Sequence, residues 1–482
     1  MIRRDITVLA LVLSATTWAA NAPDAKTVLA DASKALGADG LKSVEFSGSG
    51  FDYTLGQNPT PSSPWPKFND KTYARYINFD NPESRMSRIR TQFENPPRGG
   101  GQQPIVGEQQ QNQVIAPGSP AAATIWDDLM MSVPYGFVRA ASAAKDVKVG
   151  SKSMGGKKYT TVTFTAANKA PATGYFNADH VLERVETKID NNVLGDISFV
   201  TTYADYKSFG TLKFPAHIVQ AQGGFPVLDL TISDVKMNTA PTVAGAAGGR
   251  GGAGGGNAPA STPTEKLSDG VYLILGGYAA LALDYGDHIL IIEGPQSDQR
   301  AEEVMATAKQ LIPGKPIKYV VNTHAHFDHS GGLRDFVAEG VTIITHEVNK
   351  PYYQKIWSNP HTLAPDRLSK SPKKAVFKTV GEQMELTGNG HTVMLYHMQD
   401  FLHHNGMLLA YLPKEKILVE ADGFNPPARA VTQASATISP YNLSLLANID
   451  RLKLSVDRII PIHLPADNRK ITVAEVMKAV GK

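Results

Sequence analysis

The second half of the chain, residues 266–482, alternates short apolar runs with amphipathic segments. Between the runs, apolar residues recur at helical spacing over 301–312 and 445–452. A last helix is expected to begin at Thr472, where Glu475 would complete a capping box. This alternation of strands and helices predicts an α/β domain. The runs of strand length are 271–275, 288–293, 317–321, 341–346, 392–398, 407–412, 417–422 and 458–463.

The first half, residues 23–239, shows a different periodicity. One helical stripe near its start is followed by segments in which apolar and polar residues alternate, as in half-buried antiparallel strands. Two polar stretches rich in proline, glycine or glutamine, 57–70 and 95–122, are expected to be loops without a core face. The helical stripe is Val28, Leu29, Ala32 and Leu36, and the clearest alternations are Val44/Phe46, Val162/Phe164 and Leu228/Leu230/Ile232.

A stretch of glycine, alanine, serine, threonine and proline, residues 240–264, separates the two halves. It offers almost no side chain that could pack, so it is expected to be a flexible linker. We therefore expect two domains that fold independently, and protease cleavage of the linker is expected to release a folded C-terminal half.

The N-terminal residues 1–22 have the layout of a secretory signal peptide. Arg3 and Arg4 precede an apolar stretch from Ile6 to about Ala15, and small residues follow. That stretch is shorter than the roughly 20 residues a membrane span requires. The alternative is an uncleaved membrane anchor. The signal-peptide interpretation predicts a periplasmic or secreted protein, without stable membrane insertion after the signal is removed.

Composition excludes several classes of function. The formal net charge of +3 gives no electrostatic reason to expect nucleic acid as a partner. The chain has no cysteine, which rules out disulfides, thiolate nucleophiles and cysteine-based metal sites. A hydrolytic nucleophile would therefore have to come from elsewhere.

The strongest chemical signal is the run 323–332, THAHFDHSGG, which follows the apolar segment 317–321. His324 and His326 are two residues apart on an extended loop, so they can share one metal ion, while Asp328 and His329 can turn toward a second. Imidazole and carboxylate ligands without thiolate suit zinc, and they also suit iron or manganese. The glycine pair is expected to let the chain tighten into the next helix.

This HxHxDH pattern resembles the metallo-β-lactamase superfamily. The resemblance implies an α/β four-layer αβ/βα sandwich over 266–482, with two divalent metal ions at the sheet edge. It also implies further ligands after later strands, for which Asp422 and His463 fit the pattern. The implied set is His324, His326 and His403 for one metal ion, Asp328, His329 and His463 for the other, and Asp422 between them.

Three neighbouring histidines are candidates for the third histidine of the first group. His397, His403 and His404 lie close together, and we choose His403, because it follows the strand in a loop where the superfamily presents its ligand. His404 would then face the cleft or solvent as a substrate contact. His346 would either lie at the cleft rim as a further substrate contact or have a structural role. Glu293 stands where many members carry an aspartate.

The superfamily reaction is hydrolysis by a hydroxide held between two metal ions, with Asp328 orienting the water and taking part in proton transfer. A carboxylate at Asp422 is typical of ester, lactone and thioester hydrolases, and it argues against, without excluding, β-lactamase activity. The first half resembles the curved half-barrel of periplasmic lipoprotein carriers, a mainly antiparallel β domain. The alternative function is therefore binding or carriage of an apolar ligand, with the metal domain secondary. A small-molecule substrate is expected in either case.

Overall fold

The computed structural model describes residues 24–101, 103–119, 126, 129–243 and 262–482. The expected signal peptide, and the expected linker apart from 240–243 and 262–264, lie outside the described residues. Among the described helices, none has the length and apolar character needed to cross a membrane.

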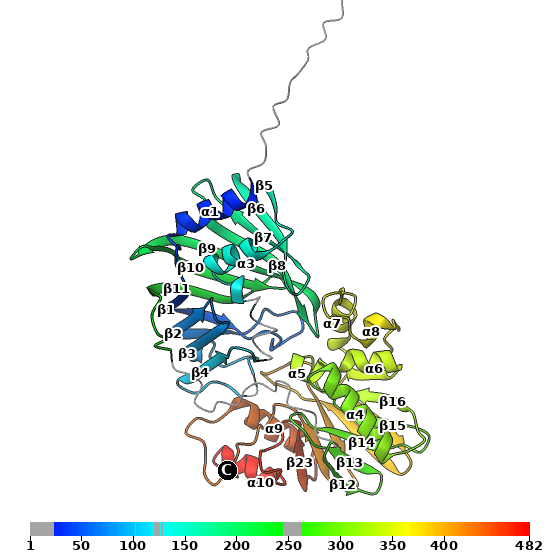
Figure 1. The fold of residues 1–482 in the computed structure, drawn as a ribbon. Helices are drawn as coiled ribbons and strands as arrows, with labels where there is room; N and C mark the ends of the chain where they lie inside the picture. Colours follow the sequence, from blue (N-terminus) through cyan, green and yellow to red (C-terminus); the bar gives the residue numbers. More distant parts are fainter. Residues whose placement is uncertain (1–23, 102, 120–125, 127–128, 244–261) are drawn as a thin grey trace, which may run out of the picture.

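The N-terminal domain is built on one large sheet in which every neighbouring pair is antiparallel (Figure 1). The sheet has 11 strands among the described residues, in the order β4-β3-β2-β1-β11-β10-β9-β8-β7-β6-β5. The strands are β1 (Ser43–Tyr53), β2 (Lys67–Asn78), β3 (Glu83–Gln92), β4 (Gln109–Ile115), β5 (Lys148–Met154), β6 (Lys157–Thr165), β7 (Pro171–Phe176), β8 (Leu182–Asn191), β9 (Gly195–Phe209), β10 (Leu212–Gln222) and β11 (Phe225–Met237).

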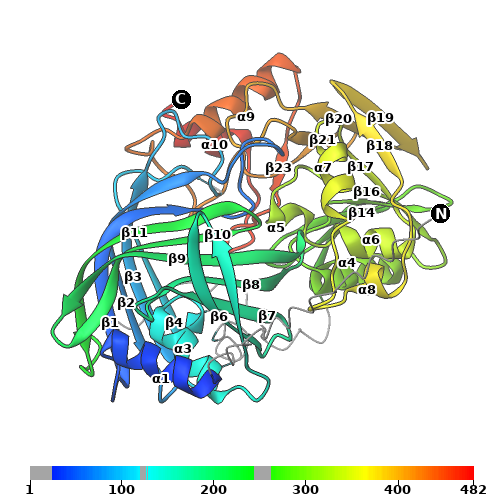
Figure 2. The same ribbon diagram turned by 90° about the horizontal axis from the view of Figure 1, so that it is seen from above.

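Two helices, α1 (Ala25–Leu36) and α3 (Pro134–Ala143), pack against each other and against this sheet. Figure 2 shows how strongly the sheet curves. The buried residues of α1 are Val28, Leu29, Ala32 and Leu36, the stripe that the sequence predicts. The sequence therefore locates this helix and the mainly β character of the domain correctly.

The prediction for the two polar stretches is partly wrong. Strand β2 begins inside the expected loop 57–70, and β4 lies inside the expected loop 95–122. The first stretch also has a core face, because Trp65 and Phe68 are buried. The proline and glutamine residues of these stretches favour loops in the sequence, whereas in the structure β2 and β4 both pair with β3.

The C-terminal domain has two sheets. Their inner faces share one apolar core with α9 and α10, which cover the second sheet, while α4 and α6 cover the outer face of the first. The first sheet contains β12 (Thr264–Ser268), β13 (Val271–Ile274), β14 (Ala280–Asp284), β15 (Ile289–Ile292), β16 (Ile317–Val321), β17 (Thr342–His346) and β18 (Phe377–Val380). The second contains β19 (Gln383–Gly388), β20 (His391–His397), β21 (Leu408–Leu412), β22 (Ile417–Glu420) and β23 (Arg458–Pro461). The helices are α4 (Asp298–Leu311), α5 (Phe327–Ser330), α6 (Leu333–Glu339), α7 (Asn349–Ile356), α8 (Arg367–Lys370), α9 (Pro440–Arg451) and α10 (Val473–Ala479).

The start of α10 is predicted correctly but for the wrong reason. Thr472 is its N-cap residue, yet its side chain makes no capping hydrogen bond. The carboxylate of Glu475 instead accepts hydrogen bonds from Arg469 and from the backbone of Val431. The expected capping box is therefore absent.

The two domains are in extensive contact. One cluster of buried apolar side chains has members in both, and the ring of Trp65 packs edge-on against Phe327 at 5.9 Å between centroids. At a second place, Asp196 accepts hydrogen bonds from the backbone of Thr362 and Leu363. The expected linker is thus not the only link between the halves.

Candidate metal centre

The candidate site lies where several strands of the C-terminal domain end. Strands β15, β16 and β17 run parallel, and so do β22 and β23 in the other sheet. The motif follows the carboxyl end of β16, Asp422 follows β22, and His463 follows β23. The carboxyl ends of parallel strands are the usual place for ligands in α/β sheets.

Asn322 shapes the motif loop. Its side-chain amide donates to the backbone carbonyls of His324 (2.8 Å) and His329 (3.0 Å). Its own oxygen accepts from the hydroxyls of Thr345 and Tyr353. Asn322 therefore holds the motif loop at His324 and at His329. The short helix α5 carries Asp328 and His329.

The glycine pair after the motif serves close packing. Gly331 and Gly332 have ordinary negative φ values of −62° and −95°. A Cβ on Gly331 would lie 2.0 Å from the carbonyl oxygen of Gln296, and one on Gly332 would lie 2.7 Å from the Cβ of Ala301. The sequence predicts glycine here so that the chain can tighten into the next helix. In the structure, glycine is required instead because the segment that begins α4 approaches closely.

The first group of ligand-type residues is His324, His326, His403 and Asp422. One ligand atom from each lies within 4.8 Å of all the others, and all four residues are buried. His324 Nε2, His326 Nδ1 and His403 Nε2 have no hydrogen-bond partner. Buried polar atoms normally have partners, so three orphaned nitrogens facing one carboxylate fit a bound cation.

The second group is Asp328, His329 and His463. His329 Nε2 lies 3.5 Å from Asp328 Oδ2 and 3.1 Å from His463 Nε2. Asp328 is the most accessible member, with 19% of its side chain exposed. The second group is therefore the more accessible of the two to a molecule that enters from solvent.

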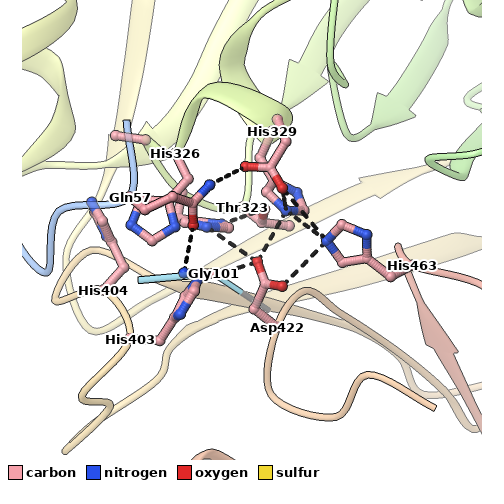
Figure 3. A network of polar contacts seen from close by, with 12 residues as sticks. Gln57, Gly101, Thr323, His326, His329, His403, His404, Asp422 and His463 are labelled. Atoms are coloured by element: carbon pink, nitrogen blue, oxygen red, sulfur yellow. Dashed lines mark hydrogen bonds and ion pairs between the residues drawn. The ribbon is translucent and has the colours of Figure 1, made fainter. Parts of the chain in front are cut away.

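Asp422 lies between the two groups (Figure 3). Its Oδ2 is 3.4 Å from His324 Nε2 and 3.3 Å from His403 Nε2, and 3.0 Å from His329 Nε2. Its Oδ1 is 3.2 Å from His463 Nε2. One carboxylate thus touches both groups. Glu420 fixes the turn that carries it, by accepting hydrogen bonds from the backbone of Gly423 and Phe424.

The electrostatics favour cation binding in the first group. Burial and the neighbouring His403 lower the pKa of His326 to about 3, so its ring is neutral and offers a lone pair. Burial opposes the ionised form of Asp422, but His463, His403 and His329 outweigh it and hold its pKa well below the usual range. For His329, burial opposes the charged form, but Asp328 and Asp422 raise its pKa well above normal. The opposite shifts of His329 and Asp422 have a common origin in their contact, since His329 Nε2 lies 3.0 Å from Asp422 Oδ2.

A segment of the N-terminal domain, residues 56–59, completes the site. The Gln57 amide donates to Asp328 Oδ1 at 2.8 Å, and its oxygen accepts from the backbone of Gly101 (Figure 3). His326 Nε2 lies 2.8 Å from the backbone carbonyl of Asn58. Since a carbonyl can only accept, the proton of His326 is on Nε2, which leaves Nδ1 for a cation.

Comparison with known proteins agrees with this geometry. Residues 294–463 match the metallo-beta-lactamase superfamily. The C-terminal region belongs to this superfamily. Its two-sheet arrangement is the metallo-beta-lactamase fold, as the sequence predicts.

Individual relatives are distant. A curated relative, the 2,4-dinitroanisole O-demethylase subunit alpha of Nocardioides sp. (strain JS1661), is 24% identical over 163 residues, which cover 34% of this chain and 46% of the relative. The match thus spans about half of that protein. A metallo-beta-lactamase from Pontibacter korlensis is 16% identical, covering 46% of this chain and 97% of its own, with a TM-score of 0.34. The sec-alkylsulfatase Pisa1 from Pseudomonas sp. is 16% identical, covering 45% and 40%, with a TM-score of 0.33.

Glu293 directly follows strand β15. It is fully buried, and its Oε2 lies 3.1 Å from His329 Nδ1 and accepts from the hydroxyl of Thr323 at 2.6 Å. The Glu293 side chain therefore orients His329, whose Nε2 faces the site. Such a partner fixes the ring of a histidine ligand.

The remaining predicted histidines have separate places. The structure puts His403 in the first group, whereas His404 Nδ1 accepts from the backbone of Gly406 at 2.9 Å. His404 is fully buried, so it does not face solvent. His346 is buried against His397, with ring centroids 4.1 Å apart, and belongs to neither group. These contacts fit the structural role expected as the alternative for His346, and its role as a substrate contact stays a prediction.

Sequence reasoning missed four residues at the site: Gln57, Tyr278 and Asn322, which contribute side chains, and Asn58, which contributes its backbone carbonyl. The Tyr278 hydroxyl lies 3.4 Å from Asp328 Oδ2, and its ring packs on His463 at 4.8 Å between centroids. No motif marks these residues. Asn322 alone had a signal, because it directly precedes the motif.

Proposed function

We propose that the protein is a dinuclear metal hydrolase that cleaves an ester, lactone or thioester bond. The observation that carries this proposal is the pair of ligand groups sharing Asp422, with three orphaned histidine nitrogens in the first group. His324, His326 and His403 would hold one cation. Asp328, His329 and His463 would hold the other, and Asp422 would contact both.

Two bound divalent cations would make a water molecule acidic enough to attack at neutral pH and would polarise the substrate carbonyl. Zinc suits this set of imidazole and carboxylate ligands, and iron or manganese is compatible with it. Membership of a superfamily of metal-dependent hydrolases supports the same reaction class.

Asp328 would transfer the proton of the attacking water. His329 and His463 oppose the burial of Asp328 and lower its pKa, so its carboxylate is ionised at neutral pH. Gln57 holds Asp328 Oδ1, which leaves Oδ2, beside the Tyr278 hydroxyl, to accept a proton from the attacking water and return it to the leaving group. The other ligand-type residues are buried and exclude bulk water.

A panel of substrates identifies the bond that is cleaved. The curated relative is named for demethylation of 2,4-dinitroanisole, so activated aryl methyl ethers belong in the assay beside esters, lactones and thioesters. β-Lactams belong there too. We further propose that the protein acts in the periplasm or outside the cell, since residues 1–22 have the layout of a signal peptide.

The test is metal analysis combined with a hydrolysis screen. We expect two divalent cations per chain, loss of activity on chelation, and recovery with zinc, iron or manganese. The variant Asp328→Asn should lose turnover, and His180→Ala, which removes an exposed histidine in a turn of the N-terminal domain, should not. A chain that binds no cation and cleaves no member of the panel would overturn the proposal and favour a binding or carrier function.

A further inference from the structure

A large cavity lies between the two domains beside the candidate metal centre. It has a volume of about 920 Å³, within the range of small-molecule sites. One wall is formed by residues 92–97 and 103–106 of the N-terminal domain, and the other by residues of the C-terminal segment 424–442, which follows Asp422. The cavity therefore exists only because the two domains meet.

The walls of this cavity expose large apolar side chains. Phe93 is 47% exposed, Val106 52% and Ile438 43%, and all three line it. In the described parts of the chain, only two other large apolar residues, Phe225 (44%) and Val376 (54%), are exposed as much as Ile438. Exposed apolar side chains that gather in one hollow typically mark a binding site for an apolar group.

A single side chain, that of Asn425, connects the cavity with the ligand-type residue Asp422. Asn425 lines it and donates to Asp422 Oδ1 at 3.1 Å. On the same side, the Tyr441 hydroxyl donates to the carbonyl of Gly99, and its ring lies 5.1 Å from that of His403. A molecule in the cavity can therefore extend a polar end toward Asp422.

The charges of the lining indicate an uncharged occupant. Glu94 and Arg429 are the charged residues of the lining, and their charges cancel. The curved sheet of the N-terminal domain has a groove of its own, of about 730 Å³, but Arg75, Arg88 and several glutamines line it. The interdomain cavity is thus the better place for an uncharged apolar group.

We propose that this cavity binds the apolar acyl or aryl group of an uncharged carbonyl substrate, with the scissile bond beside Asp422. This proposal rests on the proposed hydrolase function. It gives the N-terminal domain a role as one wall of the specificity pocket. A substrate with a larger apolar group should gain affinity by burying more apolar surface.

The first arm of the test uses 4-nitrophenyl acetate and 4-nitrophenyl octanoate on the full-length metal-loaded protein. The native chain should prefer the octanoate, and the double variant Val106→Ser/Ile438→Ser should lower the octanoate-to-acetate ratio of kcat/KM by roughly tenfold or more, mainly through KM. The matched control is Val376→Ser, because Val376 is 54% exposed but does not line the cavity. It should leave the ratio unchanged. A chain-length preference that the double variant leaves intact would overturn the proposal.

The second arm measures binding without catalysis. The uncharged fluorescent probe N-phenyl-1-naphthylamine should bind the native chain and bind the double variant several-fold more weakly, with Val376→Ser as before. If the double variant binds the probe more weakly but the native chain hydrolyses no ester, the cavity is supported as a binding site and the hydrolase function is overturned. If the native chain hydrolyses esters without a chain-length preference and the double variant binds the probe as the native chain does, the hydrolase function is supported and the cavity proposal is overturned.

Discussion

Two segments meet at the candidate metal centre, and they contribute in different ways. The motif segment 323–332 supplies ligand-type side chains, whereas segment 56–59 of the N-terminal domain supplies an amide and a backbone carbonyl. The first segment decides which ions can bind. The second fixes the direction of Asp328 and the tautomer of His326. Sequence patterns therefore reveal the ligand-type residues of such a site. They do not reveal the residues that orient those ligands.

The largest effect should come from the ligand side of this comparison. Asp422→Ser removes the one carboxylate that contacts both groups, so we expect at least tenfold weaker cation binding and lower turnover, with one cation lost more readily than the other. Titration calorimetry and elemental analysis would measure this. Asp269→Ser, which removes a fully exposed carboxylate of the same domain, is the control. Unchanged stoichiometry and rate would make Asp422 a simple turn residue.

The next effect tests the N-terminal side. Gln57→Ala removes the donor to Asp328 Oδ1, and we expect about tenfold weaker binding of the cation held by Asp328, His329 and His463. Gln57→Glu should weaken turnover further, because a carboxylate cannot donate to Asp328. The affinity of the first group should hardly change in either variant. Equal weakening of both cations would mean that segment 56–59 acts on the fold as a whole.

Gly56 tests how closely that segment must approach. Its φ is +76°, and a Cβ would lie 2.3 Å from Cγ of Phe327, within the motif. Gly56→Ala should therefore cost about 1–3 kcal/mol of stability and weaken cation binding. Gly107→Ala is the matched control, since Gly107 has a φ of +64° with open space around it. Calorimetric unfolding of both variants would separate backbone strain, common to both, from the contact with Phe327.

A smaller effect concerns pH. Each segment is followed by a buried carboxyl group without a hydrogen-bond partner: Asp70 on β2 and Asp335 on α6. Burial raises the pKa of each to about 7, above its ordinary value of 3.8. The folded chain thus holds more protons than the unfolded chain, and stability should fall as the pH rises from about 4 to about 7. Asp70→Asn and Asp335→Asn should each flatten the dependence of Tm on pH between 5 and 8. A slope unchanged in both variants would contradict this.

The structure brings together the residues predicted for the C-terminal side of the site, each of which follows an apolar strand along the chain. Thr323 to His329, Asp422 and His463 all follow strand ends, and a strand end carries its own local signal. The choice of His403 over His404 rests on its position in the loop after the strand. In the structure, His404 Nδ1 accepts a hydrogen bond from the backbone of Gly406.

The N-terminal side could not be predicted in the same way. His326 and Asn58 are 268 residues apart, and the contact uses a backbone carbonyl, which every residue has. The polar stretch 57–70 was expected to lack a core face, although Trp65 packs on Phe327. Contacts between domains depend on how the domains dock, and no local periodicity encodes that.

The smallest effect is expected from cutting the chain between the domains. The sequence alone predicts that cleavage within 240–264 releases the C-terminal half. The contacts predict otherwise, because a shared apolar cluster, the Trp65–Phe327 contact and the hydrogen bonds to Asp196 hold the domains together. A specific protease site placed within 244–261 should therefore give two fragments that elute as one species and keep their cations and activity. The uncut chain is the control. Two separate peaks, with a C-terminal fragment that retains both cations, would show that segment 56–59 is dispensable and that the site belongs to one domain alone.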